Sequence, residues 1–449
     1  MRVKPLDYHP RPLHKVSDGE TVPPSGSKVG PQCSVRPTST RKALLVVYIG
    51  HFTRYLYLLI LIPFYARVLG AAEYGKVLAA MSLFTVVWMV VEYGFPPIGM
   101  RDVASTTDKG TIGAHFRAQI KARLLTAAIG IAVGAIGTAC SPLLNAEPAY
   151  GVIATAIGVV SAFNLAWYFQ ATHRFRTSTL LNIAFFAINL VLILSLVHDA
   201  GDGLTVLLSL LVTSVIVTLI AYVIVVLRIG TQTGRFPSAD LIRESSPLFL
   251  ANGMPVLMTS ASTYLLTLFV SADQVGFFAA AERLAALVLG FMAPAGQVLV
   301  ATVAVRLSSR EGETQAYTLM RKSFVFMAYF GVAACLGALM LSPYLIPVIF
   351  GRGFDSSIPI MQILGLMFPF AAFSQVVRSY VLFPLHQDKL LAISTMAGAM
   401  FSVLAILLLA AAFGALGVAV ARVLGEIVTA TILLVILVRQ KLFGRILRS

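Results

Sequence analysis

Residues 204–227 read LTVLLSLLVTSVIVTLIAYVIVVL, a run of 24 residues without a charged side chain. A helix needs about 20 predominantly apolar residues to cross the hydrocarbon core of a bilayer. The run is continuously apolar and does not alternate every second residue, so it favours a helix over a strand of a membrane barrel. This stretch therefore predicts a membrane-spanning helix.

The same pattern recurs along most of the chain. Hydrophobic residues make up 58% of the sequence and charged residues only 12%, and the mean hydropathy of +0.86 excludes an ordinary soluble domain. We therefore expect an all-α integral membrane protein with 12 transmembrane helices. The other apolar runs lie at 43–66, 77–97, 117–140, 149–170, 179–197, 247–270, 274–305, 322–350, 358–384, 389–412 and 415–438.

Lysine and arginine are unevenly distributed between the two sides of this topology. An even number of spans places both termini on one side, and 27 of the 34 basic residues fall in segments on that side, Arg123 among them. Three lie on the opposite side and four lie within apolar runs. By the positive-inside rule, both termini are cytoplasmic. The net charge of +15 then faces anionic membrane lipids, and we expect no nucleic-acid binding.

The chain divides into a polar arm and two halves. Residues 1–42 hold seven prolines among polar and basic residues, which predicts a disordered cytoplasmic arm and not a signal peptide. The turn AAEYG at 71–75 is echoed by ADQVG at 272–276, an offset of 201 residues that indicates two parallel six-helix repeats. We expect an N-lobe at 43–228, a cytoplasmic linker at 229–246, a C-lobe at 247–438 and a basic tail at 439–449.

Four arginines interrupt the apolar runs. A cation at the centre of a membrane helix costs roughly 2.5–3.5 kcal/mol on insertion scales, so it usually faces a protein interior or an aqueous cavity. Buried positive charge suggests a path for an anionic substrate, and we take Arg54, Arg283 and Arg378 as candidate binding residues. Arg283 could instead pair with another helix, and Arg378 could extend to the cytoplasmic surface. His51 shares a helix face with Arg54; it is a further candidate, or a packed, hydrogen-bonded side chain.

Acidic residues in the apolar runs have separate roles. Glu92 and Glu282 are candidates for ion coupling, because a carboxylate within the membrane can carry a proton or a sodium ion; a contact at a helix end is the alternative for Glu92. Arg422 and the fourth residue after it, Glu426, are expected to form a structural pair. The three cysteines lack metal-ligand spacing, and we expect no metal, cofactor or catalytic residue.

Three segments resemble the polysaccharide-export, O-antigen flippase branch of the multidrug/oligosaccharidyl-lipid/polysaccharide (MOP) superfamily. They are RVLGAAEYG at 67–75, WYFQATHR at 167–174 and SADQVGFFAAAER at 271–283. The match departs from the family at Ala171 and His173, where the family more often has glycine and an acid.

The resemblance implies a V-shaped pair of six-helix lobes around a basic central cavity in the bacterial inner membrane. It also implies movement of an undecaprenyl-diphosphate-linked oligosaccharide repeat unit from the inner to the outer leaflet, for O-antigen, exopolysaccharide or capsule synthesis. A polysaccharide polymerase and chain-length machinery would be possible partners.

Three other functions compete with this hypothesis. A multidrug or cation antiporter of the same superfamily would hold several acids in its cavity, whereas arginines outnumber acids in these runs. A lipid II flippase is chemically closer, but the motifs favour the O-antigen branch. A membrane-embedded enzyme would need a large external loop, and no predicted external loop exceeds about a dozen residues.

Overall fold

The computed structural model describes residues 40–106, 108–229, 238–290, 310–382, 385 and 387–440. Helices and short turns account for this part of the chain, and no strand occurs in it. The elements are α1 (Thr40–Glu92), α2 (Phe95–Ala104), α3 (Lys109–Cys140), α4 (Pro142–Ala146), α5 (Pro148–Ala162), α6 (Ala166–Ala171), α7 (Phe175–Leu196), α8 (Gly203–Ile229), α9 (Ser238–Leu266), α10 (Ala272–Gly290), α12 (Arg310–Phe350), the 3-10 turn η1 (Arg352–Phe354), α13 (Ser357–Gly365), α14 (Phe368–Val376), the π-helical turn η2 (Val377–Leu382) and α15 (Asp388–Arg439).

Eight segments of the described chain are long and apolar enough to cross a membrane. The run that begins at residue 204 forms α8 within two residues of its predicted ends. Helix α15 contains two predicted runs, separated by Gly414 in a left-handed conformation. The prediction of a helical, multi-pass membrane protein is confirmed, and the count of 12 spans stays a prediction. The eight segments are Ile60–Glu92, Lys109–Cys140, Pro148–Ala171, Phe175–Leu196, Gly203–Ile229, Tyr317–Phe350, Ser357–Leu382 and Lys389–Arg439.

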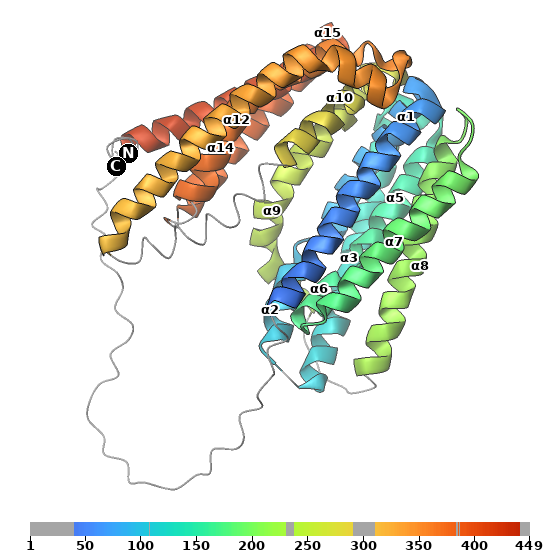
Figure 1. Ribbon diagram of the computed structural model, residues 1–449. Helices are drawn as coiled ribbons and strands as arrows, with labels where there is room; N and C mark the ends of the chain where they lie inside the picture. Colours follow the sequence, from blue (N-terminus) through green and yellow to red (C-terminus); the bar gives the residue numbers. More distant parts are fainter. Residues whose placement is uncertain are drawn as a thin grey trace.

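The helices gather in two groups that meet at one end and diverge toward the other (Figure 1). We call α1–α8 the N-terminal bundle and α10–α15 the C-terminal bundle. Helix α9 lies between them and packs against both α1 and α15. The chain bends sharply within α1 at Gly70, where φ is 72°, and this bend lies at the end where the bundles meet. We call that end, formed by the turns at 67–76 and 264–276, the apex.

Two glycines make the closest approach between the bundles at the apex. A Cβ atom on Gly75 would overlap the carbonyl oxygen of Ala272, and a Cβ atom on Gly276 would overlap that of Ala71. Gly276 follows Gly75 by 201 residues, and Ala272 follows Ala71 by the same number. Each glycine therefore contacts the counterpart of the alanine that precedes it in its own turn, and the contact is reciprocal. The two echoed turns of the sequence therefore pack directly against each other around a local pseudo-two-fold axis.

Hydrogen bonds around the apex also join each half of the chain to the other. The Ser141 hydroxyl, in the turn after α3, donates to Thr267 Oγ1 at 2.8 Å, just after α9. In the other half, Arg67, just before the Gly70 bend, donates to the carbonyl of Val348 near the end of α12. Tyr74 packs edge-on against Phe354, with ring centroids 5.6 Å apart. These contacts fasten each half to the other and close the apex.

Candidate functional site

A cavity of about 660 Å³ lies inside the N-terminal bundle. Its lining includes residues of α2 and α6, two helices that lie near the end at which the bundles diverge (Figure 1). Its walls come from the last turns of α1 and from α2, α5, α6, α7 and α8. Small-molecule sites usually measure about 300–1,000 Å³, so the cavity is large enough for a ligand. We take this cavity as the candidate functional site.

The cavity wall combines amides, hydroxyls and aromatic rings with one acid. Glu92 is the one charged side chain among the described residues that line it. Both tryptophans of the sequence, Trp88 and Trp167, also contribute to the wall. The remaining lining residues with polar or aromatic side chains are Ser161, Asn164, Gln170, Phe175, Ser178, Thr179, Asn182, Phe185, Phe186, Ser214 and Thr218.

Glu92 has a buried guanidinium group behind it. Arg123 on α3 is only 1% exposed, and it interacts electrostatically with Glu92. Its Nη1 atom lies 3.4 Å from the carbonyl oxygen of Asn164, and its guanidinium group also interacts with the Tyr222 side chain. An unpaired buried charge costs several kcal/mol. The two opposite charges therefore support each other at the edge of the cavity.

Several polar groups of the wall are available to a ligand. The Nε1 donor of Trp167 is not among them, because it is enclosed by protein, without a partner among the described residues. The Asn164 side chain accepts from the Ala166 amide at 2.7 Å, which fixes its carbonyl and leaves its NH₂ group as a donor. Gln170 and Asn182 are exposed at the cavity rim. The cavity thus offers both donors and acceptors.

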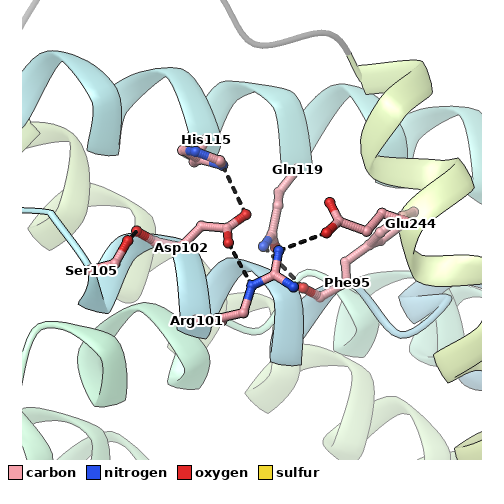
Figure 2. Close-up of polar contacts among 7 residues, drawn as sticks. All are labelled: Phe95, Arg101, Asp102, Ser105, His115, Gln119 and Glu244. Carbon is pink, nitrogen blue, oxygen red and sulfur yellow. Dashed lines mark hydrogen bonds and ion pairs between the residues drawn. The ribbon is translucent and has the colours of Figure 1, made fainter. Parts of the chain in front are cut away.

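A charged network holds α2 and α3 to the start of α9 at the same end of the molecule (Figure 2). Arg101 donates to Asp102 at 2.8 Å and to Glu244 of α9 at 2.7 Å, and both bonds raise the pKa of its guanidinium group. Asp102 also lies 3.8 Å from Nδ1 of His115. Gln119 donates to the Phe95 carbonyl at 3.2 Å. Because α2 supplies cavity residues Pro96 and Met100, this network positions one wall.

Aromatic stacking strengthens that link between the N-terminal bundle and α9. The rings of Tyr93 and Phe249 are stacked with centroids 4.6 Å apart. The Tyr93 and Ser246 hydroxyls are 3.3 Å apart. Helix α9 is therefore bound to the N-terminal bundle at both of its ends, here and at the apex.

The predicted site residues are distributed over both bundles. Glu92 lines the cavity, as described above. Arg54 lies on α1, but its side chain and that of His51 are outside the described residues. Arg283 is exposed on α10, the helix that contacts α1 at the apex and faces the N-terminal bundle (Figure 1). Its neighbour Glu282 accepts a hydrogen bond from Thr263 of α9 at 2.7 Å.

The remaining predicted residues lie on the far helices of the C-terminal bundle. Arg378 is partly exposed in the π-helical turn, and its Nε donates to the Ser374 carbonyl at 3.3 Å. Arg422 and Glu426 do not form the expected pair in this conformation: no ion pair joins them in the described part of the chain, and Arg422 Nε and Glu426 Oε1 lack partners there. The i, i+4 spacing permits such a pair but does not enforce it.

Sequence reasoning missed the buried environment of Arg123 and a polar cluster beside the cavity. From the sequence, Arg123 counts among the basic residues of the cytoplasmic side, although it falls inside the apolar run at 117–140. Helix α3 begins at Lys109, so Arg123 lies about 21 Å along it, surrounded by protein. Tyr57 donates to the buried Asn189 side chain, which in turn donates to Thr213 at 3.4 Å. Asparagine and threonine within apolar runs were the available signal for this cluster.

No group of three or more potential metal ligands occurs among the described residues. Within that same part of the chain, the charged and polar side chains instead form binding surfaces and helix contacts. The arrangement is suited to holding a polar solute between helices, and nothing in the wall of the cavity has the geometry of a nucleophile next to a base.

Comparisons with known proteins agree with this description. A family model described as "Polysaccharide biosynthesis protein" matches residues 40–304. A candidate O-antigen transporter of Shigella dysenteriae is 24% identical over 397 residues, which cover 86% of this chain and 97% of that protein.

Two solved structures are similar in fold. The lipid II flippase MurJ, in an inward closed conformation, is 13% identical, covers 88% of this chain and 87% of its own, and has a TM-score of 0.57. A multidrug resistance MATE family transporter of the MOP superfamily, in an inward-facing conformation, is 15% identical, covers 86% of this chain and 98% of its own, and has a TM-score of 0.59.

Proposed function

The chain belongs to the polysaccharide biosynthesis protein family, within the MOP superfamily, and we propose that it moves an undecaprenyl-diphosphate-linked oligosaccharide from the inner to the outer leaflet of the bacterial inner membrane. The family and the structural neighbours indicate a transporter rather than an enzyme. The repeat unit would serve O-antigen, exopolysaccharide or capsule synthesis. A polymerase and chain-length machinery would then act on the delivered unit.

The observation that carries this proposal is the reciprocal contact at the apex. Two bundles that are fastened at one end and diverge at the other can alternate if the apex opens when the opposite end closes. The apex is held by the backbone contact of Gly75 with Gly276, by hydrogen bonds and by the packing of Tyr74 on Phe354. Opening would break these contacts between the bundles and leave the helix packing inside each bundle in place. The distribution of basic residues supports a cytoplasmic position for the diverging end, where the lipid-linked glycan would be assembled.

We expect the diphosphate of the substrate to bind the arginine side chains one after another as it crosses the membrane. Guanidinium groups bind phosphate oxygens in pairs, which suits a headgroup that cannot enter hydrocarbon. Arg54 lies on α1 and Arg283 on α10, two helices that border the space between the bundles, whereas Arg378 lies in η2 of the C-terminal bundle (Figure 1). Glu92 and Glu282 are the proposed sites of ion coupling. His51 is a further candidate contact, and the polyprenyl chain would stay in lipid.

This function requires a symmetrical arrangement of spans. We propose 12 spans in two lobes, at 43–228 and 247–438, joined by the linker at 229–246. Both termini, with the arm at 1–42 and the tail at 439–449, would face the cytoplasm. The reciprocal apex contact supports two parallel repeats, because equivalent turns from each half meet there.

One observation favours a second function, a multidrug or cation antiporter of the same superfamily. A carboxylate and aromatic rings lie together in the wall of the cavity, and this combination also suits a lipophilic cation. The two functions make different demands on Arg283, because only an anionic headgroup needs its charge. A lipid II flippase would share that demand and differ in the glycan that it accepts.

Accumulation of lipid-linked glycan in cells that lack this chain tests the proposal. We expect the deletion to trap polyprenyl-diphosphate glycan on the inner leaflet, with export restored by the wild type and not by Arg283→Ala at equal membrane levels. Rescue by Arg283→Lys would indicate a need for charge alone. Gln362→Ala, a polar substitution elsewhere in the C-terminal bundle, is the matched control. If the deletion traps no glycan and instead raises sensitivity to cationic drugs, the antiporter function replaces the flippase.

A further inference from the structure

We propose that the cavity of the N-terminal bundle binds a sugar of the transported glycan, and that Glu92 makes it reject acidic sugars. This inference rests on the proposed function and adds a site for the glycan, separate from the arginines expected to contact the diphosphate. All of the described residues that line the cavity belong to the N-terminal bundle.

The wall matches the two surfaces of a sugar. A sugar presents hydroxyls that both donate and accept around its edge, and C–H groups on its faces. Carboxamides such as Gln170 and Asn182 supply a donor and an acceptor on one short side chain. Aromatic rings such as Trp88 and Phe186 supply apolar area for the C–H face. A wall built for a lipophilic cation would need fewer amides and hydroxyls.

Charge explains the expected selectivity. Glu92 is the one charged side chain among the described lining residues, whereas Arg123 lies behind it and does not line the cavity. A uronic acid in the cavity would place a second carboxylate close to Glu92 without a lining cation to compensate. Like charges at short range disfavour binding, which is how sites reject close analogues. Neutral sugars, including acetamido sugars, meet no such repulsion.

Intrinsic fluorescence provides a direct test, because Trp88 and Trp167 are the only tryptophans in the sequence and both line the cavity. Purified full-length protein would be titrated with glucose, galactose, rhamnose, N-acetylglucosamine and glucuronic acid, each to about 100 mM, with calorimetry as a second readout. We expect at least one neutral sugar to change the tryptophan emission saturably. We expect glucuronic acid to bind at least about tenfold more weakly than that sugar.

Variants separate a sugar site from a general solvent effect. Gln170→Ala combined with Asn182→Ala should weaken binding of the neutral sugar about tenfold, since each removes a hydrogen bond. Glu92→Gln should reduce the ratio between the affinities for the neutral sugar and for glucuronic acid to less than about threefold. Gln362→Ala, in the C-terminal bundle, should change neither the affinity for the neutral sugar nor the affinity for glucuronic acid.

The outcomes distinguish this inference from the proposed function. If no sugar changes the emission or the heat of the wild type, the sugar site is refuted, and the arginine-dependent export of lipid-linked glycan is unaffected. Saturable binding of tetraphenylphosphonium in place of sugars would overturn the inference in favour of a cation site. Equal affinity for neutral and acidic sugars would refute the role of Glu92.

Discussion

A methyl group added to Gly276 should force the apex open. Its Cβ atom would overlap the carbonyl oxygen of Ala71 and approach the amide nitrogen of Gly75 at 3.3 Å. Ordinary van der Waals contact begins near 3.4 Å, and the atoms in the way belong to the backbone of another helix. No side chain can rotate aside, so α10 and α1 must separate by about 1 Å.

The size of the effect follows from the cost of overpacking. One extra methyl group in a tightly packed contact typically costs about 1–3 kcal/mol. This strain acts on the conformation with a closed apex and disappears when the apex opens. The ratio of closed to open molecules should therefore fall by about 5- to 150-fold. Gly75→Ala should have the same effect, because it meets the Ala272 carbonyl in the reciprocal contact.

Disulfide crosslinking across the apex measures the closed population. Ser141 and Thr267 face each other with their hydroxyl oxygens 2.8 Å apart, so Ser141→Cys with Thr267→Cys should crosslink when the apex is closed. The three native cysteines would first be replaced. We expect Gly276→Ala to slow crosslinking by at least about fivefold. Gly353→Ala is the control, because a Cβ atom there has no heavy atom within 4 Å. Crosslinking of Gly276→Ala at the wild-type rate, in a chain of equal stability, would show that a Cβ atom at this position does not open the apex.

Three further predictions concern the diverging end and a loop. Arg123→Gln should lower the free energy of unfolding by about 3 kcal/mol, as measured by thermal unfolding, because it leaves the Glu92 carboxylate without its opposite charge. Adding Glu92→Gln should recover part of that loss, whereas additive losses would show that the two charges are uncoupled. Arg101→Ala should leave the midpoint of thermal unfolding nearly unchanged in the same assay, because the bond between Arg101 and Glu244 is exposed. A clear drop in that midpoint would contradict this expectation. Two backbone amides lower the pKa of Asp202, so its stabilisation of the loop before α8 is present above the ordinary aspartate pKa and is lost as the pH falls through the lower folded value. The protection of those amides against hydrogen exchange, taken relative to the intrinsic rate at each pH, should fall over that range, and should not change with pH in Asp202→Asn.

The sequence predicts the helices well where burial alone decides them. The uncharged run at 204–227 forms α8 almost to the residue, because a long apolar segment in lipid has no alternative to a helix. The turns at 71–75 and 272–276 were recognised as equivalent. That they touch each other could not be inferred, since it depends on how the two halves dock.

The site was harder to predict because it depends on packing between helices. Glu92 was selected from its charge alone, and it does line the cavity. Arg123 was treated as a topological marker, because a basic residue near the end of a run resembles the many that face the cytoplasm. The amides that surround Glu92 carry no individual signal, since asparagine and glutamine also occur in ordinary helix turns. Only the docking of α6 and α7 brings Gln170 and Asn182 to one wall.

The proposal that this chain moves a lipid-linked glycan between leaflets can be measured directly, as the transfer of a fluorescent polyprenyl-diphosphate glycan across the membrane of reconstituted vesicles. We predict that vesicles containing the wild-type chain move the lipid between leaflets at least about tenfold faster than protein-free vesicles, and that Arg283→Ala removes most of this acceleration while Gln362→Ala does not. Equal rates with and without the protein, in vesicles where the same preparation exchanges tetraphenylphosphonium for protons, would contradict it.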